Sequence, residues 1–387
     1  FLWQSRSIVI AGTNGKTTTV GMLRHLLDAE GARAASIGTL GVLVGSEGVS
    51  VPGGAGLTTP GPIELQRVLR TLADNGVRTV AIEASSHALD QHRLDGLAFS
   101  AAVFTNVTRD HLDYHHTMES YLQAKLRLAS LLGHDGVMVV NADDRAWGAL
   151  PPRGGSITYG RSPDAAVRAT DAHFTLRGSS WTLHAGGRAR AVELPLLGDF
   201  NIVNALCAAA TGVALGHDAG TMAARLGNLP QVPGRLERLS DAPVVLRDYA
   251  HTPDALGRAL AALKPFAKRG RLIVVFGCGG DRDAGKRPLM GAVAERLAGH
   301  VILTSDNPRT EDPERILDAI EAGMRHRAHE RIEDRRAAIA RALDVADRDH
   351  DIVLLAGKGH ETHQVRGTER FPFDEALIVR VLLAERR

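Results

Sequence analysis

The chain is poor in cysteine, in aromatic residues and in net charge. It has 387 residues, of which 2 are cysteine and 4% are aromatic, and its formal net charge is +2. Cys207 and Cys278 lie far apart without the short spacing of a metal site, which fits small buried residues in a reducing compartment better than a disulfide scaffold. No basic run stands out, so the charge pattern does not indicate nucleic acid or a membrane surface as a partner.

Long hydrophobic runs are also missing. The longest apolar stretch, around residues 202–215, is rich in alanine and interrupted by Asn204, and it falls short of the roughly 20 residues that a membrane span needs. No secretory leader is visible. We therefore expect a cytoplasmic protein without a membrane span, and the 44% hydrophobic content predicts two or three cores.

A glycine-rich loop near the start of the chain is the strongest motif. An apolar run at residues 8–11 leads into the loop, and a helical pattern begins near Val20. Backbone N–H groups, the helix N-terminus and a lysine ammonium would bind nucleotide phosphates there, and a threonine hydroxyl would reach Mg²⁺. The glycines are closer together than in the common G-x-x-x-x-G-K-[ST] loop. The predicted phosphate-binding residues are Gly12, Thr13, Asn14, Gly15, Lys16, Thr17 and Thr18.

The alternation of strands and helices predicts an α/β protein with two domains. Residues 1–234 are expected to form a P-loop-type ATP-binding domain with a mostly parallel sheet and helices on both faces. Short alternating runs at residues 156–197 predict an antiparallel appendage to it. After the Pro230–Gly234 stretch, a second αβ series predicts a Rossmann-like domain over residues 235–387.

Some local expectations are more specific. The glycine-rich segment 41–56 is expected to be irregular, and helices are expected over about 117–132 and 313–325. The glycines at 277–280 follow a strand, but they lack the G-x-G-x-x-G pattern, which disfavours a dinucleotide site.

Two side chains of the first domain follow predicted strands, where parallel sheets bind their ligands. Glu83 ends one strand and could hold Mg²⁺ through its carboxylate oxygens, or it could be a solvated charge. His111 follows the next strand. This position favours His111 as a site residue over the alternative, a surface-loop cluster with His115 and His116.

The motifs, taken together, resemble those of the Mur ligases of peptidoglycan synthesis, over nearly the whole chain. They are GTNGKT (12–17), LTTP (57–60), EASSH (83–87), TNVTRDHLD (105–113), YLQAK (121–125), PGR (233–235), DYAHTP (248–253), DNPR (306–309) and GKGHE (357–361). Within the family, the resemblance is to the members that add the third peptide residue. It implies ATP- and Mg²⁺-dependent joining of meso-diaminopimelate to UDP-N-acetylmuramoyl-L-alanyl-D-glutamate by way of an acyl phosphate.

The resemblance also implies residue roles. Lys16, Lys125, His111 and Glu83 would be catalytic, and Thr17, Glu83, His111 and a carbamylated Lys125 would be associated with the metal. Carbamylation needs a neutral amine, so it implies a lowered pKa for Lys125, which would otherwise be a solvated helix residue. Asn201, Arg235 and Asp248 match nucleotide contacts, and the muramoyl-dipeptide contacts would be Thr58, Thr59, Ser85, Gln91 and Arg93.

For the amino-acid pocket, the resemblance implies Arg282, Asp306, Asn307, Pro308, Arg309, Gly357 and Glu361. Diaminopimelate differs from lysine by one carboxylate. A forked arginine donor such as Arg309 therefore favours diaminopimelate, unless it is a plain surface charge. Gly357 and Glu361 would receive the distal amino end, and Arg287 is close enough in sequence to be a partner.

Family members carry a further amino-terminal domain that holds the uridine, and this sequence begins where their ATPase domain begins. We expect that domain to be missing from this chain, or the protein to be a shortened homologue. The alternatives are a lysine-adding or folylpolyglutamate-type ligase and a non-catalytic nucleotide-binding module. The expected state is a monomer.

Overall fold

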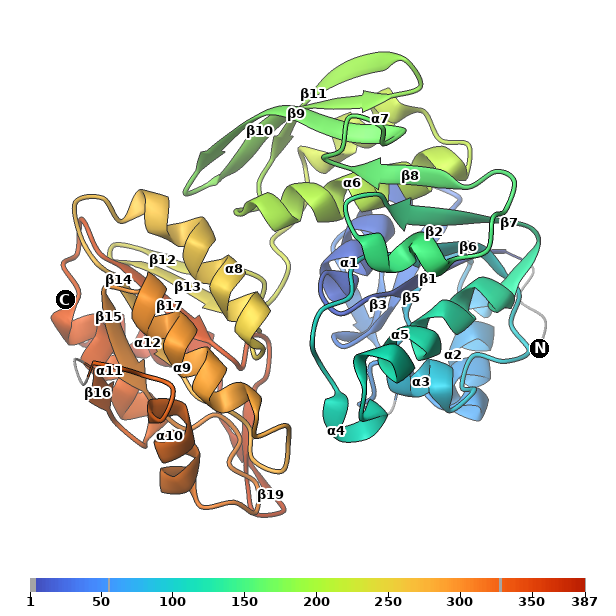
Figure 1. Ribbon diagram of the computed structural model, residues 1–387. Coiled ribbons are helices and arrows are strands. Elements are labelled where there is room, and N and C mark those ends of the chain that lie inside the picture. The colour runs from blue at the N-terminus through green and yellow to red at the C-terminus, as the bar shows by residue number, and fades with distance from the viewer. Residues whose placement is uncertain (1–4, 55, 327–328, 387) are drawn as a thin grey trace. The chain divides into compact units, whose positions relative to one another are not determined.

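The computed structural model describes residues 5–54, 56–326 and 329–386 (Figure 1). The chain divides into two compact units, Phe1–Pro230 and Gln231–Arg387, which we call the first and second unit. The division lies at the start of the proline- and glycine-containing stretch 230–234. Each unit has its own sheet and its own hydrophobic core.

The first unit contains an 11-stranded sheet in the order β11-β10-β9-β8-β7-β6-β1-β5-β2-β3-β4. The strands from β9 to β2 in that order run parallel, and antiparallel strands extend the sheet at both ends. The strands are β1 (Arg6–Ala11), β2 (Arg33–Gly38), β3 (Gly41–Val44), β4 (Val49–Val51), β5 (Val77–Glu83), β6 (Phe99–Phe104), β7 (Leu132–Asn141), β8 (Ile157–Gly160), β9 (Val167–Thr175), β10 (Gly178–Ala185) and β11 (Arg188–Leu194).

Helices cover both faces of this sheet. Apolar residues of α2 and α3 pack with the side chains of β1 and β5 on one face, while α1 and α6 pack together on the other (Figure 1). The α-helices are α1 (Lys16–Leu27), α2 (Pro62–Asp74), α3 (Ser86–Asp90), α4 (Leu112–His115), α5 (Met118–Leu126), α6 (Asp199–Ala214) and α7 (Ala219–Leu226). The 3₁₀ helices are η1 (Arg127–Leu131) and η2 (Arg145–Ala149).

The expected α/β fold is confirmed, with local differences. Segment 41–56 is not wholly irregular, because β3 and β4 form antiparallel pairs at the edge of the sheet. Valine residues alternate through these short strands, and the glycines lie at their turns. The antiparallel appendage is confined to β9–β11, since β8 is parallel to both of its neighbours. The helix expected over about 117–132 is divided in two. The α-helix α5 ends at Leu126, and the 3₁₀ helix η1 continues to Leu131.

The second unit has a six-stranded sheet in the order β12-β13-β17-β14-β15-β16, which is parallel except for β12. A separate hairpin joins β18 to β19. The strands are β12 (Glu237–Asp241), β13 (Val244–Asp248), β14 (Leu272–Phe276), β15 (His300–Leu303), β16 (Glu330–Arg331), β17 (Ile352–Ala356), β18 (His363–Arg366) and β19 (Glu369–Pro372).

Helices α11 and α12 cover one face of this sheet, and α8 and α9 pack together (Figure 1). The helices are α8 (Pro253–Leu263), η3 (Lys264–Phe266), α9 (Lys286–Leu297), α10 (Pro313–Glu321), α11 (Arg335–Val345) and α12 (Glu375–Ala384). Helix α10 is shorter than the expected 313–325, since Gly323 follows its last turn. Strands β12 and β16 and the β18–β19 hairpin were not expected from the sequence.

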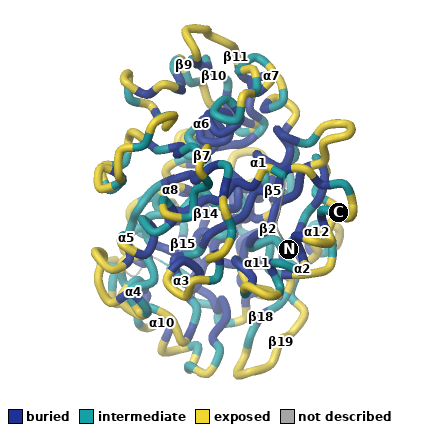
Figure 2. The backbone as a smooth tube through the Cα atoms, turned by 90° about the vertical axis from the view of Figure 1, so that its right-hand side faces the viewer, coloured by how far each residue is buried: buried dark blue, intermediate teal, exposed yellow. Residues whose placement is uncertain are grey.

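The central strands of both units consist mostly of buried residues (Figure 2). Strands β14 and β17 consist entirely of buried residues, as parallel strands covered on both faces require. Cys207 and Cys278 are free and buried. Among the helices of the described residues, none combines the length and the apolar character needed to cross a bilayer.

Candidate functional site

The first unit gathers its candidate residues where β1, β5 and β6 end. These three strands are parallel neighbours, so Gly12, Glu83 and Thr105 follow or end strands at one edge of the sheet. Helix α1 begins at Lys16, directly after the glycine-rich loop. Gly15 precedes it with φ 85°, and a Cβ atom there would lie 2.3 Å from Asn204 Oδ1, so the position requires glycine.

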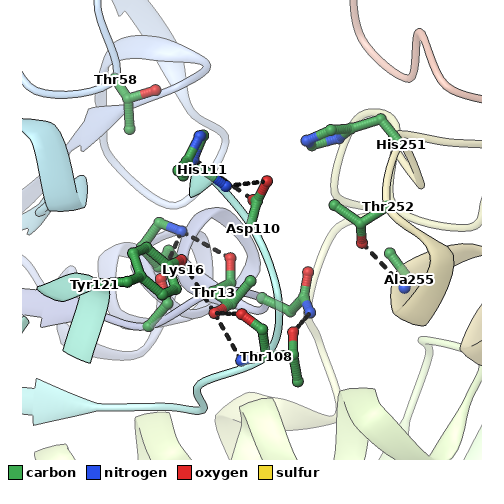
Figure 3. Close-up of polar contacts among 12 residues, drawn as sticks. Thr13, Lys16, Thr58, Thr108, Asp110, His111, Tyr121, His251, Thr252 and Ala255 are labelled. Atoms are coloured by element: carbon green, nitrogen blue, oxygen red, sulfur yellow. Dashed lines mark hydrogen bonds and ion pairs between the residues drawn. The ribbon is translucent and has the colours of Figure 1, made fainter. Parts of the chain in front are cut away.

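Two lysine side chains converge on the carbonyl oxygen of Gly12. Lys16 Nζ donates to it at 2.9 Å and also donates to the carbonyl oxygen of Thr13 at 2.9 Å (Figure 3). Lys125 Nζ donates to it at 2.7 Å and is almost completely buried. Burial lowers the pKa of Lys125 well below its usual value, and the nearby charge of Lys16 lowers that pKa further. The sequence alone favoured a solvated lysine at this position.

The residues after β6 hold the glycine-rich loop in shape. Thr13 Oγ1 donates to the carbonyl oxygen of Thr108 and shares a 3.1 Å hydrogen bond with the hydroxyl of Tyr121 (Figure 3). The backbone N–H of Asn14 donates to Asn106 Oδ1 at 2.9 Å. Burial raises the pKa of Tyr121, which therefore remains a neutral hydrogen-bonding group. These bonds fix the conformation of the glycine-rich loop.

Glu83 is a buried carboxylate at the end of β5. Its Oε2 accepts from the Thr17 hydroxyl at 3.1 Å and from the Thr39 hydroxyl at 3.2 Å, and its Oε1 accepts from the Thr39 N–H at 2.9 Å. The possibility of a solvated charge is therefore wrong for Glu83, whose exposed fraction is 1%. Thr39 was missed in the sequence, although it follows β2 at the same edge of the sheet.

His111 precedes α4 in a left-handed backbone conformation, with φ 53°. Its Nε2 lies 3.5 Å from Asp110 Oδ2 (Figure 3). Its ring meets that of His87 edge to face, with 4.9 Å between the ring centroids. Burial is the main cause that lowers the pKa of His111 to about 4. The charge of Lys16 acts in the same direction, and the charge of Asp110 opposes it. The imidazole is therefore neutral near pH 7 and keeps a lone pair.

The predicted metal residues offer a donor set that fits Mg²⁺ in part. Thr17 and Glu83 bring a hydroxyl and a carboxylate together, and such oxygen atoms are the ligands that this hard cation prefers. Among the described residues, no three His, Cys, Asp or Glu side chains group closely enough to hold a metal by themselves. A carbamate on Lys125 would supply the further anionic oxygen atoms.

The predicted muramoyl-dipeptide residues form one hydrogen-bonded network beside Glu83. The Thr58 hydroxyl bonds to the Thr39 hydroxyl at 3.2 Å. Arg93 donates to the carbonyl oxygen of Thr59 at 3.0 Å and to Gln91 Oε1. Thr59 is fully buried and joins the backbones of Glu83 and Ser85. Its side chain thus supports the loop, whereas Thr58 is only partly buried.

The predicted nucleotide contacts are divided between the units. Asn201 lies on α6 and accepts from Asn204, whose side chain faces Gly15 in the glycine-rich loop. In the second unit, Asp248 ends β13 and accepts from the N–H of Leu236 at 2.7 Å. Burial raises the pKa of Asp248 to about 6, against the lowering effect of Arg235.

The predicted amino-acid residues of the second unit follow the ends of β14, β15 and β17, three neighbouring parallel strands. Asn307 Nδ2 donates to Glu361 Oε2 at 2.9 Å. Asp306 Oδ2 is buried and accepts no hydrogen bond from the described residues. A Cβ atom at Gly357 would lie 2.4 Å from this oxygen, so glycine leaves the space in front of it open.

Two arginines approach the same loops. Arg309 Nη1 donates to the carbonyl oxygen of Gly280 at 2.7 Å, and Arg282 lies on the loop that follows that glycine. Burial lowers the pKa of Arg309, and the charge of Arg282 lowers it further. Arg287 is buried and paired with Glu311 at 2.8 Å, so it supports the loop.

The model of the Mur ligase middle domain matches residues 10–212, and that of the Mur ligase glutamate ligase domain matches residues 234–359. The chain belongs to the Mur ligase family. The UDP-N-acetylmuramoyl-L-alanyl-D-glutamate–2,6-diaminopimelate ligases of Synechococcus elongatus and Ralstonia nicotianae are each 45% identical to it. The matches cover 98% of this chain and 77% and 76% of those proteins.

Solved Mur ligase-like structures share the fold. A structure of a UDP-N-acetylmuramoyl-L-alanyl-D-glutamate–2,6-diaminopimelate ligase is 38% identical, with a TM-score of 0.66 over 99% of this chain and 79% of that one. Folylpolyglutamate synthase of Mycobacterium tuberculosis complexed with ADP has a TM-score of 0.76 over 92% and 88% of the two chains. At 21% identity, this second likeness extends to the fold alone.

Lys358, a residue of the Mur ligase motifs, joins two of the predicted amino-acid-binding residues. Lys358 is completely buried, and its ammonium donates to Asn307 Oδ1 at 3.1 Å and to Glu361 Oε2 at 3.0 Å. It lies inside the GKGHE motif, yet nothing in its residue type predicted that it would join these two side chains. The ion pair fixes one oxygen of Glu361.

Proposed function

We propose that this Mur ligase uses ATP and Mg²⁺ to join meso-diaminopimelate to UDP-N-acetylmuramoyl-L-alanyl-D-glutamate in peptidoglycan synthesis. The curated relatives at 42–46% identity carry the name of this activity. We place the reaction in the cytoplasm, because ATP and the UDP-linked precursors of peptidoglycan are available in that compartment.

The observation that carries the proposal is the mixed charge of the loops that follow β14, β15 and β17 in the second unit. Arg309 supplies a forked cation, while Asp306 and Glu361 supply carboxylates from adjoining loops. A ligand with a carboxylate and an amine at each end suits this set, because it can offer a carboxylate to Arg309 and ammonium groups to Asp306 and Glu361. Lysine lacks the second carboxylate of diaminopimelate, so it would leave Arg309 without a partner. Glutamate lacks the second amine, so it would leave Asp306 or Glu361 without one.

The glycine-rich loop would bind the ATP phosphates. A carboxylate oxygen of the D-glutamate side chain attacks the γ-phosphorus, and ADP leaves. The loop N–H groups, the N-terminus of α1 and the ammonium of Lys16 offset the negative charge that develops during this transfer. Lys16 would exchange its bonds to the Gly12 and Thr13 carbonyl oxygens for phosphate oxygens.

The second half of the reaction forms the amide. The ammonium group of diaminopimelate loses a proton to solvent, and the resulting neutral amine attacks the carbonyl carbon of the acyl phosphate. The nitrogen releases a second proton to solvent as inorganic phosphate leaves and the amide forms. The pocket loops would place that amine by holding the far end of the ligand, which converts a bimolecular encounter into an oriented one.

The metal-associated residues would be Thr17, Glu83, His111 and a carbamate on Lys125. When bound, Mg²⁺ supplies charge neutralisation at the phosphate oxygens. The low pKa of Lys125 supports carbamylation, because CO₂ combines with a neutral amine. The positive charge of Lys16 then favours an anionic carbamate on Lys125 over a second ammonium group.

Phosphate release from ATP tests the proposal. The release should require the muramoyl-dipeptide and diaminopimelate together. Substituting lysine or glutamate for diaminopimelate separates a lysine-adding or folylpolyglutamate-type ligase from the proposed one. Tight ATP binding without turnover under any of these conditions would instead support a non-catalytic nucleotide-binding module.

A further inference from the structure

The β18–β19 hairpin is bonded along the Asp306–Arg309 loop of the second unit. The N–H of Arg309 donates to the carbonyl oxygen of Val365 at 3.1 Å, and the N–H of Gly367 donates to the carbonyl oxygen of Arg309 at 2.7 Å. Arg309 and Arg366 thus form a parallel bridge. The N–H of Val365 also donates to Asn307 Oδ1 at 2.9 Å. The hairpin therefore holds backbone and side-chain atoms of the pocket loop.

Arg309 needs such support because its backbone is left-handed, with φ 51°. This conformation is unfavourable for a residue with a long side chain, and it persists where the surroundings fix it. Both backbone polar groups of Arg309 are bonded to the hairpin. Its side chain leaves the loop toward the carbonyl oxygen of Gly280. The direction of the guanidinium thus depends on a conformation that the hairpin stabilises.

Gln364 is the side chain that joins the hairpin to the first residue of the loop. Its exposed fraction is 2%, and its Nε2 donates to the carbonyl oxygen of Asp306 at 2.8 Å. Its Oε1 accepts from Arg366 Nε at 3.0 Å, so both ends of the amide are engaged. Lys358 Nζ donates to the same Asn307 Oδ1 that accepts from Val365, at 3.1 Å.

We propose that Gln364 is a positioning residue, and that the β18–β19 hairpin sets the selectivity of the amino-acid pocket by holding Asp306 and Arg309 in place. This inference rests on the proposed function, because it concerns the pocket that would receive diaminopimelate. Gln364 touches no ligand in this scheme. It acts through the loop, so its loss should loosen the carboxylate-binding arginine and leave the phosphate loop of the first unit unchanged.

The first test compares Gln364→Met and Gln364→Glu with the wild-type protein. Methionine keeps the length of the side chain and removes both hydrogen bonds. Ionised glutamate keeps the acceptor for Arg366, but it removes the donor to Asp306 and places a negative charge beside that carbonyl oxygen. Each variant should raise the KM for diaminopimelate roughly tenfold, as expected for an unsatisfied buried carbonyl group, and change the KM for ATP by less than about twofold. The preference for diaminopimelate over lysine, measured as the ratio of kcat/KM values, should fall.

The control for this test is Thr368→Ala, at an exposed position in the turn of the same hairpin. It should leave the melting temperature, both KM values and the preference for diaminopimelate as in the wild type. A purely structural role for Gln364 predicts a different pattern, in which the melting temperature falls and both substrates are affected equally. That pattern would overturn the proposal, and so would an unchanged preference in the folded Gln364 variants.

A second pair of variants tests the hairpin without touching the core. Gly367 is exposed with φ 59°, and no atom lies within 4 Å of a Cβ atom placed there. Asparagine tolerates this left-handed conformation and valine does not. Gly367→Val should therefore disturb the bond to the Arg309 carbonyl oxygen and lower the preference for diaminopimelate, while Gly367→Asn should retain it. Equal preference in the two variants would contradict a positioning role for the hairpin.

The wild-type protein separates this inference from the proposed function. If it releases no phosphate with the dipeptide and diaminopimelate, the proposed function fails and the inference fails with it. If the wild type is active and prefers diaminopimelate while the Gln364 and Gly367→Val variants match it, only the inference fails.

Discussion

The ammonium of Lys125 lies 2.7 Å from the carbonyl oxygen of Gly12, to which Lys16 also donates. Two lysines that are more than 100 residues apart in the chain thus share one acceptor at the glycine-rich loop. A buried ammonium beside a second positive charge is unfavourable. The pKa of Lys125 is therefore lowered, mainly by burial and also by the charge of Lys16. This pair connects the phosphate loop to the chemistry of Lys125.

The first prediction concerns carbamylation of Lys125. Removing CO₂ and bicarbonate from the buffer should lower the rate of phosphate release, and adding bicarbonate should restore it. Lys125→Met should lower kcat by roughly 100-fold, the loss typical of a residue that orients a metal site, and its residual rate should not respond to bicarbonate. A wild-type rate that is independent of bicarbonate, with no mass increase on Lys125, would contradict this prediction.

Glu83 should determine the requirement for magnesium. Glu83→Gln keeps an acceptor for Thr17 or Thr39 but removes the charge, so the Mg²⁺ concentration that gives half-maximal activity should rise at least about tenfold. Chelation with EDTA should abolish phosphate release by the wild type. Glu64→Gln, at a half-buried position in the first turn of α2, is the matched control and should behave as the wild type. A normal Mg²⁺ response in Glu83→Gln would exclude Glu83 from the metal site.

Arg309→Ala should impair the use of diaminopimelate far more than the binding of ATP. The loss of a charge-assisted, forked contact predicts a rise of roughly 100-fold in the KM for diaminopimelate. Arg315→Ala, which changes an exposed arginine on α10, serves as the control. Equal losses for diaminopimelate and ATP would show that Arg309 does not bind the amino acid.

Asp248 gives a pH-dependent prediction. Its pKa is about 6 in the folded protein, compared with 3.8 for an ordinary aspartate. Between these values the folded state holds more protons than the unfolded state, so this residue's contribution to stability is present below about pH 4 and is lost as the pH rises through about 6. The free energy of unfolding of Asp248→Asn, relative to the wild type, should therefore increase over this interval by up to roughly 3 kcal/mol. Urea unfolding at pH 4.5 and pH 7 measures it, and parallel curves for the two proteins would refute the raised pKa.

A buried ion pair behind the amino-acid pocket should contribute to both stability and positioning. Arg335 and Glu375 are both fully buried and lie 2.8 Å apart, and Arg335 also donates to the carbonyl oxygen of Ala356, just before Gly357. Arg335→Met leaves the carboxylate of Glu375 buried without its partner, so the free energy of unfolding should fall by about 3–5 kcal/mol. The double variant Arg335→Met/Glu375→Leu should recover much of this loss in urea unfolding. Additive losses from the two changes would contradict the pairing.

The sequence by itself determined the fold class, the phosphate loop and the family motifs. Strands and helices appear in it as contiguous patterns, because apolar periodicity and glycine spacing are local properties of the chain. The second αβ series expected after residue 234 is present, with β13, α8, β14 and α9 in succession. The edge strands β3 and β4 were missed, since their glycines looked like a loop when the sheet beside them was unknown.

Only the tertiary structure decided which side chains meet. It brought Thr39 to Glu83, Lys125 to Gly12, and Gln364 to the backbone of Asp306. These contacts join segments that are far apart in the chain, and a lysine or glutamine has the same local pattern whether it is solvated or buried. Burial and neighbouring charge set the pKa of Lys125, and the β18–β19 hairpin bonds to the left-handed backbone of Arg309. Both effects depend on the packing of the folded chain, which residue spacing does not encode.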